Sequence, residues 1–172
     1  VNTPRTFFGG IPTVARAVIS PLLADRDFSI CSRFDWQPGQ QGVIFAIGEV
    51  FVGMVLYVMD DALHFVYHRW MSPIELPPVP LVAGAQDVEL AYHALGQRKG
   101  EGRLLINGAE AVAATAMSPT VMGVHVEGID IGLDRRQRIS PRYADHGSFA
   151  YTGAIDRVVV TPRTSSASRP RI

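Results

Sequence analysis

The sequence predicts an all-β domain in which antiparallel sheets stack face to face as a sandwich. The first observation is a block of three short apolar runs, at residues 43–47, 54–59 and 63–68, rich in Val, Ile, Phe and Tyr. Runs of this length and composition are typical of strands rather than helices. The second observation is a clear period of two in residues 27–36, and the third is the hairpin-forming pair Asn107-Gly108.

The central block at residues 42–68 is expected to form the middle of a sheet. Its first two runs are apolar on both faces, as in strands that are covered above and below. Asp60-Asp61 separates the second run from the third, and Asp tolerates a positive φ better than most residues, so a tight hairpin is predicted there. Because a soluble chain does not leave such a block uncovered, the remaining segments have to pack on it.

The segments before this block are expected to be an arm followed by a strand. Residues 1–26 contain several Pro and Gly, and Pro21 is expected to stop any helix that starts in residues 14–19, so we interpret them as an extended arm or linker. Apolar and polar residues alternate in 27–36, and this alternation places Phe28, Ile30, Phe34 and Trp36 on the buried face of a strand.

The segments after the block predict further short strands separated by turns. Four prolines make residues 72–84 a surface crossover, and 96–102 form a polar loop. Later strands are expected at 86–93, 103–115 (as a hairpin), 129–133 and 154–160. The total is about nine strands with no convincing helix, which indicates a sandwich or barrel at residues 27–162 and a flexible tail at 163–172.

Composition narrows the class of protein. The 172 residues are 47% hydrophobic and carry sixteen basic and sixteen acidic side chains, so no overall field attracts nucleic acid or anionic lipid. No membrane span is expected, because Glu49 and glycines interrupt the longest apolar stretch. The N-terminus shows no secretion signal, so a soluble, cytoplasmic protein is slightly favoured, although the compartment stays open. The sequence does not begin with Met, and whether it is a mature product, a fragment or the product of an unusual start codon also stays open.

Metal and cofactor sites have little support in the residue pattern, and no cofactor is expected. His64 and His68 lie four apart on one strand, roughly 13 Å from each other, which is too far for one metal ion. Glu127, Asp130 and Asp134 could supply oxygens to calcium at the rim of a sandwich, although their spacing matches no EF-hand. The simpler interpretation is that they are solvated loop acids that limit edge pairing.

Catalytic groups are equally hard to find, whereas contact residues can be named. Cys31 has no evident base, Asp130 and Asp134 lack the acidic neighbours of a glycosidase site, and residues 96–102 match no phosphate-binding loop. Residues in the predicted loops are better placed to contact a ligand or partner, and these are Trp70, Arg98, Lys99 and Tyr143.

Five segments in order resemble the C-terminal β-sandwich region of bacterial arylsulfatases. They read GVIFAIGEVFVGMVLYVMDDALHFVYH, VAGAQDVELAYH, GRLLINGAEAV, IDIGLDRRQRISPRY and FAYTGAIDRVVV. The resemblance implies an antiparallel two-sheet jelly-roll sandwich of the concanavalin A-like lectin and glucanase type, or laminin G-like. It implies no sulfatase catalytic residue, because the Cys31-Ser32-Arg33 segment lacks the proline of the formylglycine motif and has its arginine misplaced.

The leading expectation is therefore a non-catalytic accessory domain. It would pack against or assist a sulfatase catalytic domain, in cis or in trans, or mediate self-association. The alternative is a free-standing, lectin-like carbohydrate-binding module with a glycan as its partner. A third hypothesis, a jelly-roll hydrolase or lyase, requires two close carboxylates on a concave sheet.

Overall fold

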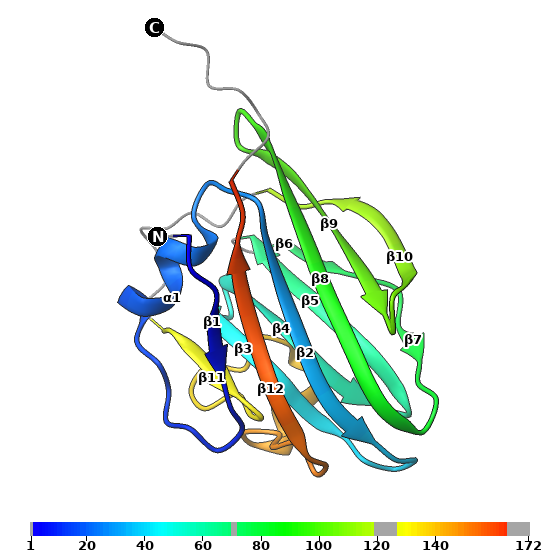
Figure 1. The fold of residues 1–172 in the computed structure, drawn as a ribbon. Coiled ribbons are helices and arrows are strands. Elements are labelled where there is room, and N and C mark those ends of the chain that lie inside the picture. The colour runs from blue at the N-terminus through cyan, green and yellow to red at the C-terminus, as the bar shows by residue number, and fades with distance from the viewer. Residues whose placement is uncertain (1, 70–71, 119–126, 165–172) are drawn as a thin grey trace, which may run out of the picture.

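A computed structural model of the chain describes residues 2–69, 72–118 and 127–164, and it shows two antiparallel sheets packed face to face (Figure 1). The front sheet has the order β1-β12-β2-β8-β9-β10, and the back sheet has the order β11-β3-β4-β5-β6, with β7 also paired to β5. The predicted fold class, an antiparallel two-sheet jelly-roll sandwich, is confirmed.

The strands account for most of the described chain. Those of the front sheet are β1 (Arg5–Phe7), β12 (Ile155–Pro162), β2 (Phe28–Trp36), β8 (Gly84–Gly96), β9 (Lys99–Ile106) and β10 (Ala109–Ala116). Those of the back sheet are β11 (Ile129–Ile131), β3 (Gly42–Glu49), β4 (Val52–Met59), β5 (Ala62–Arg69), β6 (Ser72–Glu75) and β7 (Val79–Pro80). The helical elements are α1 (Arg16–Leu23) and the 3₁₀ helix η1 (Pro141–His146).

The main core lies between the sheets and follows the predicted alternation. The apolar face of β2 is buried as expected, with exposures of 0–3% for Phe28, Ile30, Phe34 and Trp36. It packs against the inner faces of β3, β4 and β5, which supply buried side chains such as Phe45, Leu56 and Phe65. Burial of this apolar area is the main source of stability for the sandwich.

Three two-residue turns connect the long hairpins, and both residues of each turn have positive φ. The pairs are Asp60-Asp61 (φ 53° and 57°), Asn107-Gly108 (51° and 82°) and Gln97-Arg98 (51° and 58°). Such turns match the twist of the strands that they join. The first two confirm the predicted hairpins. The third corrects the predicted polar loop at 96–102, because β9 already begins at Lys99.

The predicted absence of a helix is wrong for the N-terminal segment. Helix α1 contains Pro21, yet it buries Ile19, Leu22 and Leu23 against the sandwich. Pro21 removes one backbone hydrogen bond, but the helix continues for only two residues beyond it, so burial of the apolar face outweighs that loss. Strand β1 pairs with β12 and buries Phe7. The residues interpreted as an arm are therefore packed against the sandwich.

A second, smaller core covers the outer face of the back sheet. Residues after β11 fold back over β3, β4 and β5 and bury a cluster made of Val43, Ala46, Val55, Tyr57, Val66, Ile139, Tyr143 and Phe149. The chain in this region includes η1, a second helical element that the residue pattern did not predict. The back sheet is thus apolar on both faces, as its sequence predicted.

Candidate functional site

The predicted contact residues do not gather at one place. Lys99 begins β9, and Arg98 lies at the tip of the β8–β9 turn. Trp70 lies outside the described residues. The expectation that Tyr143 is exposed in a loop is wrong, because its ring is fully buried at 5.0 Å from Tyr57 and stacks on Phe149 at 5.2 Å.

Of the three acids that were considered for calcium, Asp130 and Asp134 are buried, so their interpretation as solvated loop acids is corrected, whereas Glu127 is partly exposed. Asp134 is 1% exposed and accepts hydrogen bonds from the Ile139 N–H at 2.8 Å and the Tyr143 hydroxyl at 2.7 Å. Asp130 accepts from Thr13 Oγ1 and from the Arg135 N–H. Among the described residues no group of three or more His, Cys, Asp or Glu is placed to hold a metal ion.

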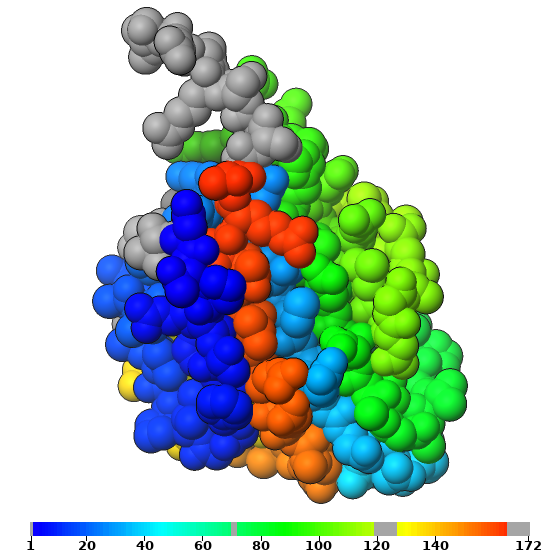
Figure 2. All heavy atoms as spheres, viewed as in Figure 1, coloured from blue at the N-terminus to red at the C-terminus, as the bar shows by residue number. Residues whose placement is uncertain are grey.

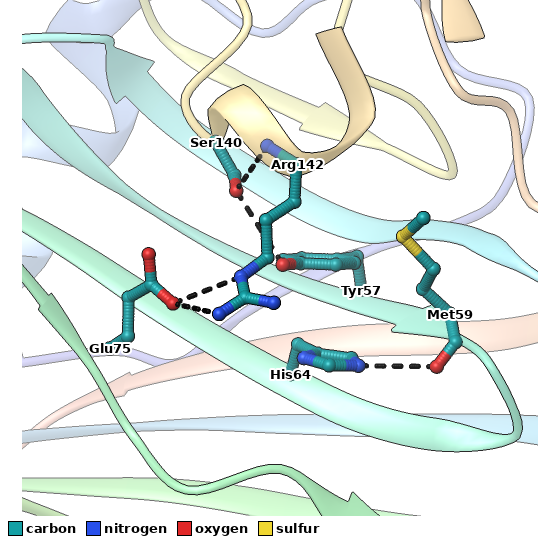
Figure 3. Close-up of polar contacts among 6 residues, drawn as sticks. All are labelled: Tyr57, Met59, His64, Glu75, Ser140 and Arg142. Carbon is teal, nitrogen blue, oxygen red and sulfur yellow. Dashed lines mark hydrogen bonds and ion pairs between the residues drawn. The ribbon is translucent and has the colours of Figure 1, made fainter. Parts of the chain in front are cut away.

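The polar residues on the back face bind mainly to one another (Figure 3). Arg142 of η1 donates to the Glu75 carboxylate of β6, with Nε and Nη2 each 3.0 Å from Oε2. The Tyr57 hydroxyl lies 3.5 Å from Ser140 Oγ, and the His64 ring stacks on Tyr57 at 4.9 Å. These contacts fasten η1 to the back sheet.

His68 lies on the same outer face of β5, and its burial is expected to make the folded chain less stable in acid. It is 6% exposed, and neither ring nitrogen has a hydrogen-bond partner. Burial lowers the pKa of His68 because it penalises the charged ring, while the backbone of Ile139 and then Glu75 oppose the shift to a smaller degree. Below the ordinary pKa of about 6.5, His68 is therefore protonated in the unfolded chain but stays neutral in the folded chain. The free energy of unfolding consequently falls as the pH falls.

We expect His68→Leu to reduce this loss. Between about pH 7.5 and pH 5.5 the variant should lose about 1 kcal/mol less stability than the native chain, as measured by urea unfolding at each pH. His146→Asn, which changes an exposed histidine of η1, is the control and should follow the native curve. Parallel pH curves for native chain and His68→Leu would show that His68 does not set the acid sensitivity.

The outer face of the front sheet is open and strongly polar. Figure 2 shows β1, β12, β2, β8 and β9 lying side by side on this face. Four pairs of side chains meet on this face. Three are ion pairs, with N···O distances of 2.8 Å for Arg33–Asp87, 3.2 Å for Arg163–Glu89 and 3.7 Å for Arg103–Glu110, and in the fourth His93 Nδ1 lies 3.1 Å from Asp27 Oδ2. We call the residues of these pairs the front-face strip.

Two hollows lie along the front-face strip. One, of about 300 Å³, is lined by residues that include His93, Arg103 and Arg163. The other, of about 520 Å³, is lined by Asp87, Glu89, Leu105, Asn107 and Gly108. Together they offer carboxylate, guanidinium and amide groups, which can hydrogen-bond to a polar ligand at two atoms at once, and an imidazole, which can do so at one.

The thiol of Cys31 beside the strip is poorly suited to nucleophilic chemistry. Cys31 lies among these residues on the outer side of β2 and is half-buried. Burial, followed by the charge of Glu89, raises the pKa of the Cys31 thiol, so the thiol stays protonated and is a poor nucleophile. This agrees with the interpretation of Cys31 as an ordinary thiol.

Sequence reasoning did not name the strip as a site, although part of the signal was present. The alternation in residues 27–36 placed Asp27 and Arg33 on the solvent face, and that in 86–93 did the same for Asp87, Glu89 and His93. The missing information was the register, which pairs Arg33 with Asp87 across β2 and β8. Arg163 fell in the predicted tail.

Comparisons of sequence and of structure give different results. No protein-family model and no curated protein matches the sequence. Solved structures do match. The CBM40 domain of the Ruminococcus gnavus IT-sialidase aligns with a TM-score of 0.63 at 11% identity, covering 97% of this chain and 95% of that chain. The same CBM40 bound to α2,3-sialyllactose aligns with a TM-score of 0.57 at 12% identity, covering 86% and 81%.

A third match comes from a larger enzyme. A leech intramolecular trans-sialidase in complex with 2,7-anhydro-Neu5Ac aligns with a TM-score of 0.58 at 13% identity, and the alignment covers 96% of this chain but 26% of that chain. At these identities the likeness shows the fold alone, which is a two-sheet β-sandwich. Within the described residues no helix has the length and apolar character needed to cross a bilayer.

Proposed function

We propose that this chain is a non-catalytic carbohydrate-binding domain and that the front-face strip is its glycan-binding surface. The observation that carries the proposal is the match, over nearly its full length, to a CBM40 domain whose structures include bound α2,3- and α2,6-sialyllactose. A second observation supports the proposal independently: the outer face of the front sheet is open and has two hollows among its paired arginine and carboxylate side chains.

The chemistry of the strip fits sugar hydroxyl groups. In each ion pair the partner orients the charged group, so its remaining lone pairs or N–H groups point in set directions. Neighbouring hydroxyls of a pyranose can then accept from a guanidinium and donate to a carboxylate. Because the side chains of the Arg33–Asp87 pair are about half exposed, with exposed fractions of 50% and 49%, binding costs little additional desolvation.

Arg103→Ala is expected to weaken glycan binding at least tenfold. Arg103 lines the 300 Å³ hollow, and losing a charge-assisted hydrogen bond costs about 1.5–3 kcal/mol. Isothermal titration with α2,3-sialyllactose, α2,6-sialyllactose and lactose, preceded by a glycan array, measures the effect. Arg142→Ala is the matched control, because this exposed arginine is also ion-paired but lies on the back face, and it should bind like the native chain.

Two outcomes would contradict this proposal. The first is the absence of saturable binding to every glycan on the array. The second is an equal loss of affinity in Arg103→Ala and Arg142→Ala, since that pattern would place the glycan elsewhere or show a general effect on folding.

The accessory-domain role stays a prediction. The structures reported above come from sialidases, so the resemblance to arylsulfatases finds no support among them. A glycan-binding domain can also sit beside a catalytic domain, so the two roles are compatible. Pull-down with a sulfatase catalytic domain, in parallel with the glycan array, separates partner binding from sugar binding.

A further inference from the structure

A third hollow lies at one end of the sandwich, beside the β8–β9 hairpin. It has a volume of about 420 Å³, and its lining comes from the end of β5, from β6, from the β8–β9 hairpin and from the segment after β10. Figure 1 shows this hairpin projecting at the top of the described chain. The lining residues are Arg69, Ser72, Pro73, Ile74, Leu95, Lys99, Gly100, Ala116, Met117 and Ser118. We call this the end hollow.

The end hollow differs from the strip in its charge. Among the described residues that line it, Arg69 and Lys99 are the charged groups, and none is Asp or Glu. Each arginine in the strip is ion-paired with a carboxylate, whereas within the described residues neither Arg69 nor Lys99 has an ion-pair partner. A ligand that carries a negative charge would therefore be attracted to the two cations of the end hollow.

The amino-acid sequence strengthens this point. Residues 70–71 are Trp-Met and residues 119–126 are PTVMGVHV, so the segments that adjoin Arg69 and Ser118 in the chain contain no acidic residue. These two segments therefore add no negative charge beside the end hollow, and Glu101, the acid nearest to Lys99 in the chain, lines the 300 Å³ hollow instead.

The other groups of the end hollow define the rest of the ligand. Arg69 Nη1 donates to Ser118 Oγ at 2.8 Å, which holds the guanidinium at the wall. Ile74, Leu95 and Met117 provide an apolar side, and Leu95 is 51% exposed although it is large and hydrophobic. An exposed apolar side chain beside two cations suits the C–H face of a sugar ring that carries an anionic substituent.

We propose that the end hollow binds an anionic group, a sulfate ester or a carboxylate, on the glycan that this domain recognises. This inference rests on the proposed function and assigns the domain to acidic glycans. Arg69 and Lys99 contact the anion, and the apolar side supports the ring. The affinity consequently falls as salt rises, because two exposed cations are screened.

The test compares acidic and neutral oligosaccharides on single variants. The probes are a sulfated oligosaccharide, its desulfated form that keeps its carboxylates, and a neutral oligosaccharide of the same length. Lys99→Gln and Arg69→Gln should each weaken binding of an acidic probe about tenfold and leave the neutral probe unchanged. The desulfated form tells whether sulfate or carboxylate is bound.

Arg98→Gln is the matched control for Lys99→Gln. It removes the same charge one residue away, at the turn, and Arg98 does not line the end hollow. Amide NMR shifts at Gly100 and Ser72 report the end hollow, and those at Ala91 report the strip.

The outcomes separate the two proposals. The inference is supported if acidic probes shift the amide signals of Gly100 and Ser72, and if Lys99→Gln lowers their affinity while Arg98→Gln does not. This holds even if no probe shifts the amide signal of Ala91. Equal binding of acidic and neutral probes, or equal losses in Lys99→Gln and Arg98→Gln, overturns it. If a neutral glycan then still shifts the amide signal of Ala91, the front-face strip binds glycans and the proposed function is supported.

Discussion

Replacing Gly42 with alanine is expected to destabilise the domain by about 3–5 kcal/mol, enough to unfold much of it at physiological temperature. Gly42 has a φ of +127°, which side-chain-bearing residues rarely adopt. A Cβ at this position would lie 2.4 Å from Tyr151 Cα and 2.5 Å from the Ala150 carbonyl oxygen. Both are backbone atoms, so a rotamer change cannot relieve the overlap.

The overlap matters because the two segments are held together. The Val43 N–H donates to the Phe149 carbonyl at 2.9 Å, and the Thr152 N–H donates to the Gln41 carbonyl at 2.9 Å. A displaced backbone would break these bonds, which connect the start of β3 to the chain that leads into β12. Urea unfolding followed by circular dichroism measures the loss.

Gly39→Ala is the control that isolates the overlap. Gly39 also has a positive φ, +85°, but a Cβ there would meet nothing within 4 Å. Its substitution should cost only about 1 kcal/mol, from backbone strain. If Gly42→Ala and Gly39→Ala lower the free energy of unfolding equally, the overlap with Ala150 and Tyr151 is not the reason for glycine at position 42.

Replacing Asp134 with alanine is the second large effect, at about 3–5 kcal/mol. The buried carboxylate accepts from the Ile139 N–H and from the Tyr143 hydroxyl, and its removal leaves both donors buried without an acceptor. Tyr143 packs against Tyr57 and Phe149, so η1 should detach from the back sheet and expose the smaller core. Near-ultraviolet circular dichroism and binding of a hydrophobic dye detect this change.

Two further variants calibrate the Asp134 result. Tyr143→Phe removes one of the two donors and should cost about half as much, while Asp145→Ala changes an exposed acid of η1 and should have little effect. A native-like unfolding curve for Asp134→Ala would mean that apolar packing alone holds η1 in place.

Asp134 and His68 respond to acid in opposite directions, although both are buried on the back face. Burial raises the pKa of Asp134, so the folded chain takes up this proton before the unfolded chain does, and acid favours the folded state through this group. Burial lowers the pKa of His68, so acid disfavours the folded state there. Asp134 therefore does not cause the acid sensitivity tested above, and His64, whose pKa burial also lowers, acts in the same direction as His68.

The site was only partly predictable. The solvent faces of β2 and β8 follow from alternation, which identifies Arg33 and Asp87 as outward residues but not as partners. Lys99 was named as a contact residue from its loop, yet its neighbour in space, Arg69, comes from a distant strand. The burial of Tyr143 and Asp134 had no local signal, because loops rich in polar residues are usually exposed.

The sequence by itself determined the features that depend on near neighbours in the chain. The turns at Asp60-Asp61 and Asn107-Gly108, the alternation of β2 and the doubly apolar β3 and β4 follow from local φ preferences and side-chain period. Only the tertiary structure decided the helix that tolerates Pro21, the burial of Asp134, and the pairing of charges into the front-face strip. These depend on contacts between residues far apart in sequence, whose energies outweigh local preference and leave no periodic trace in the chain.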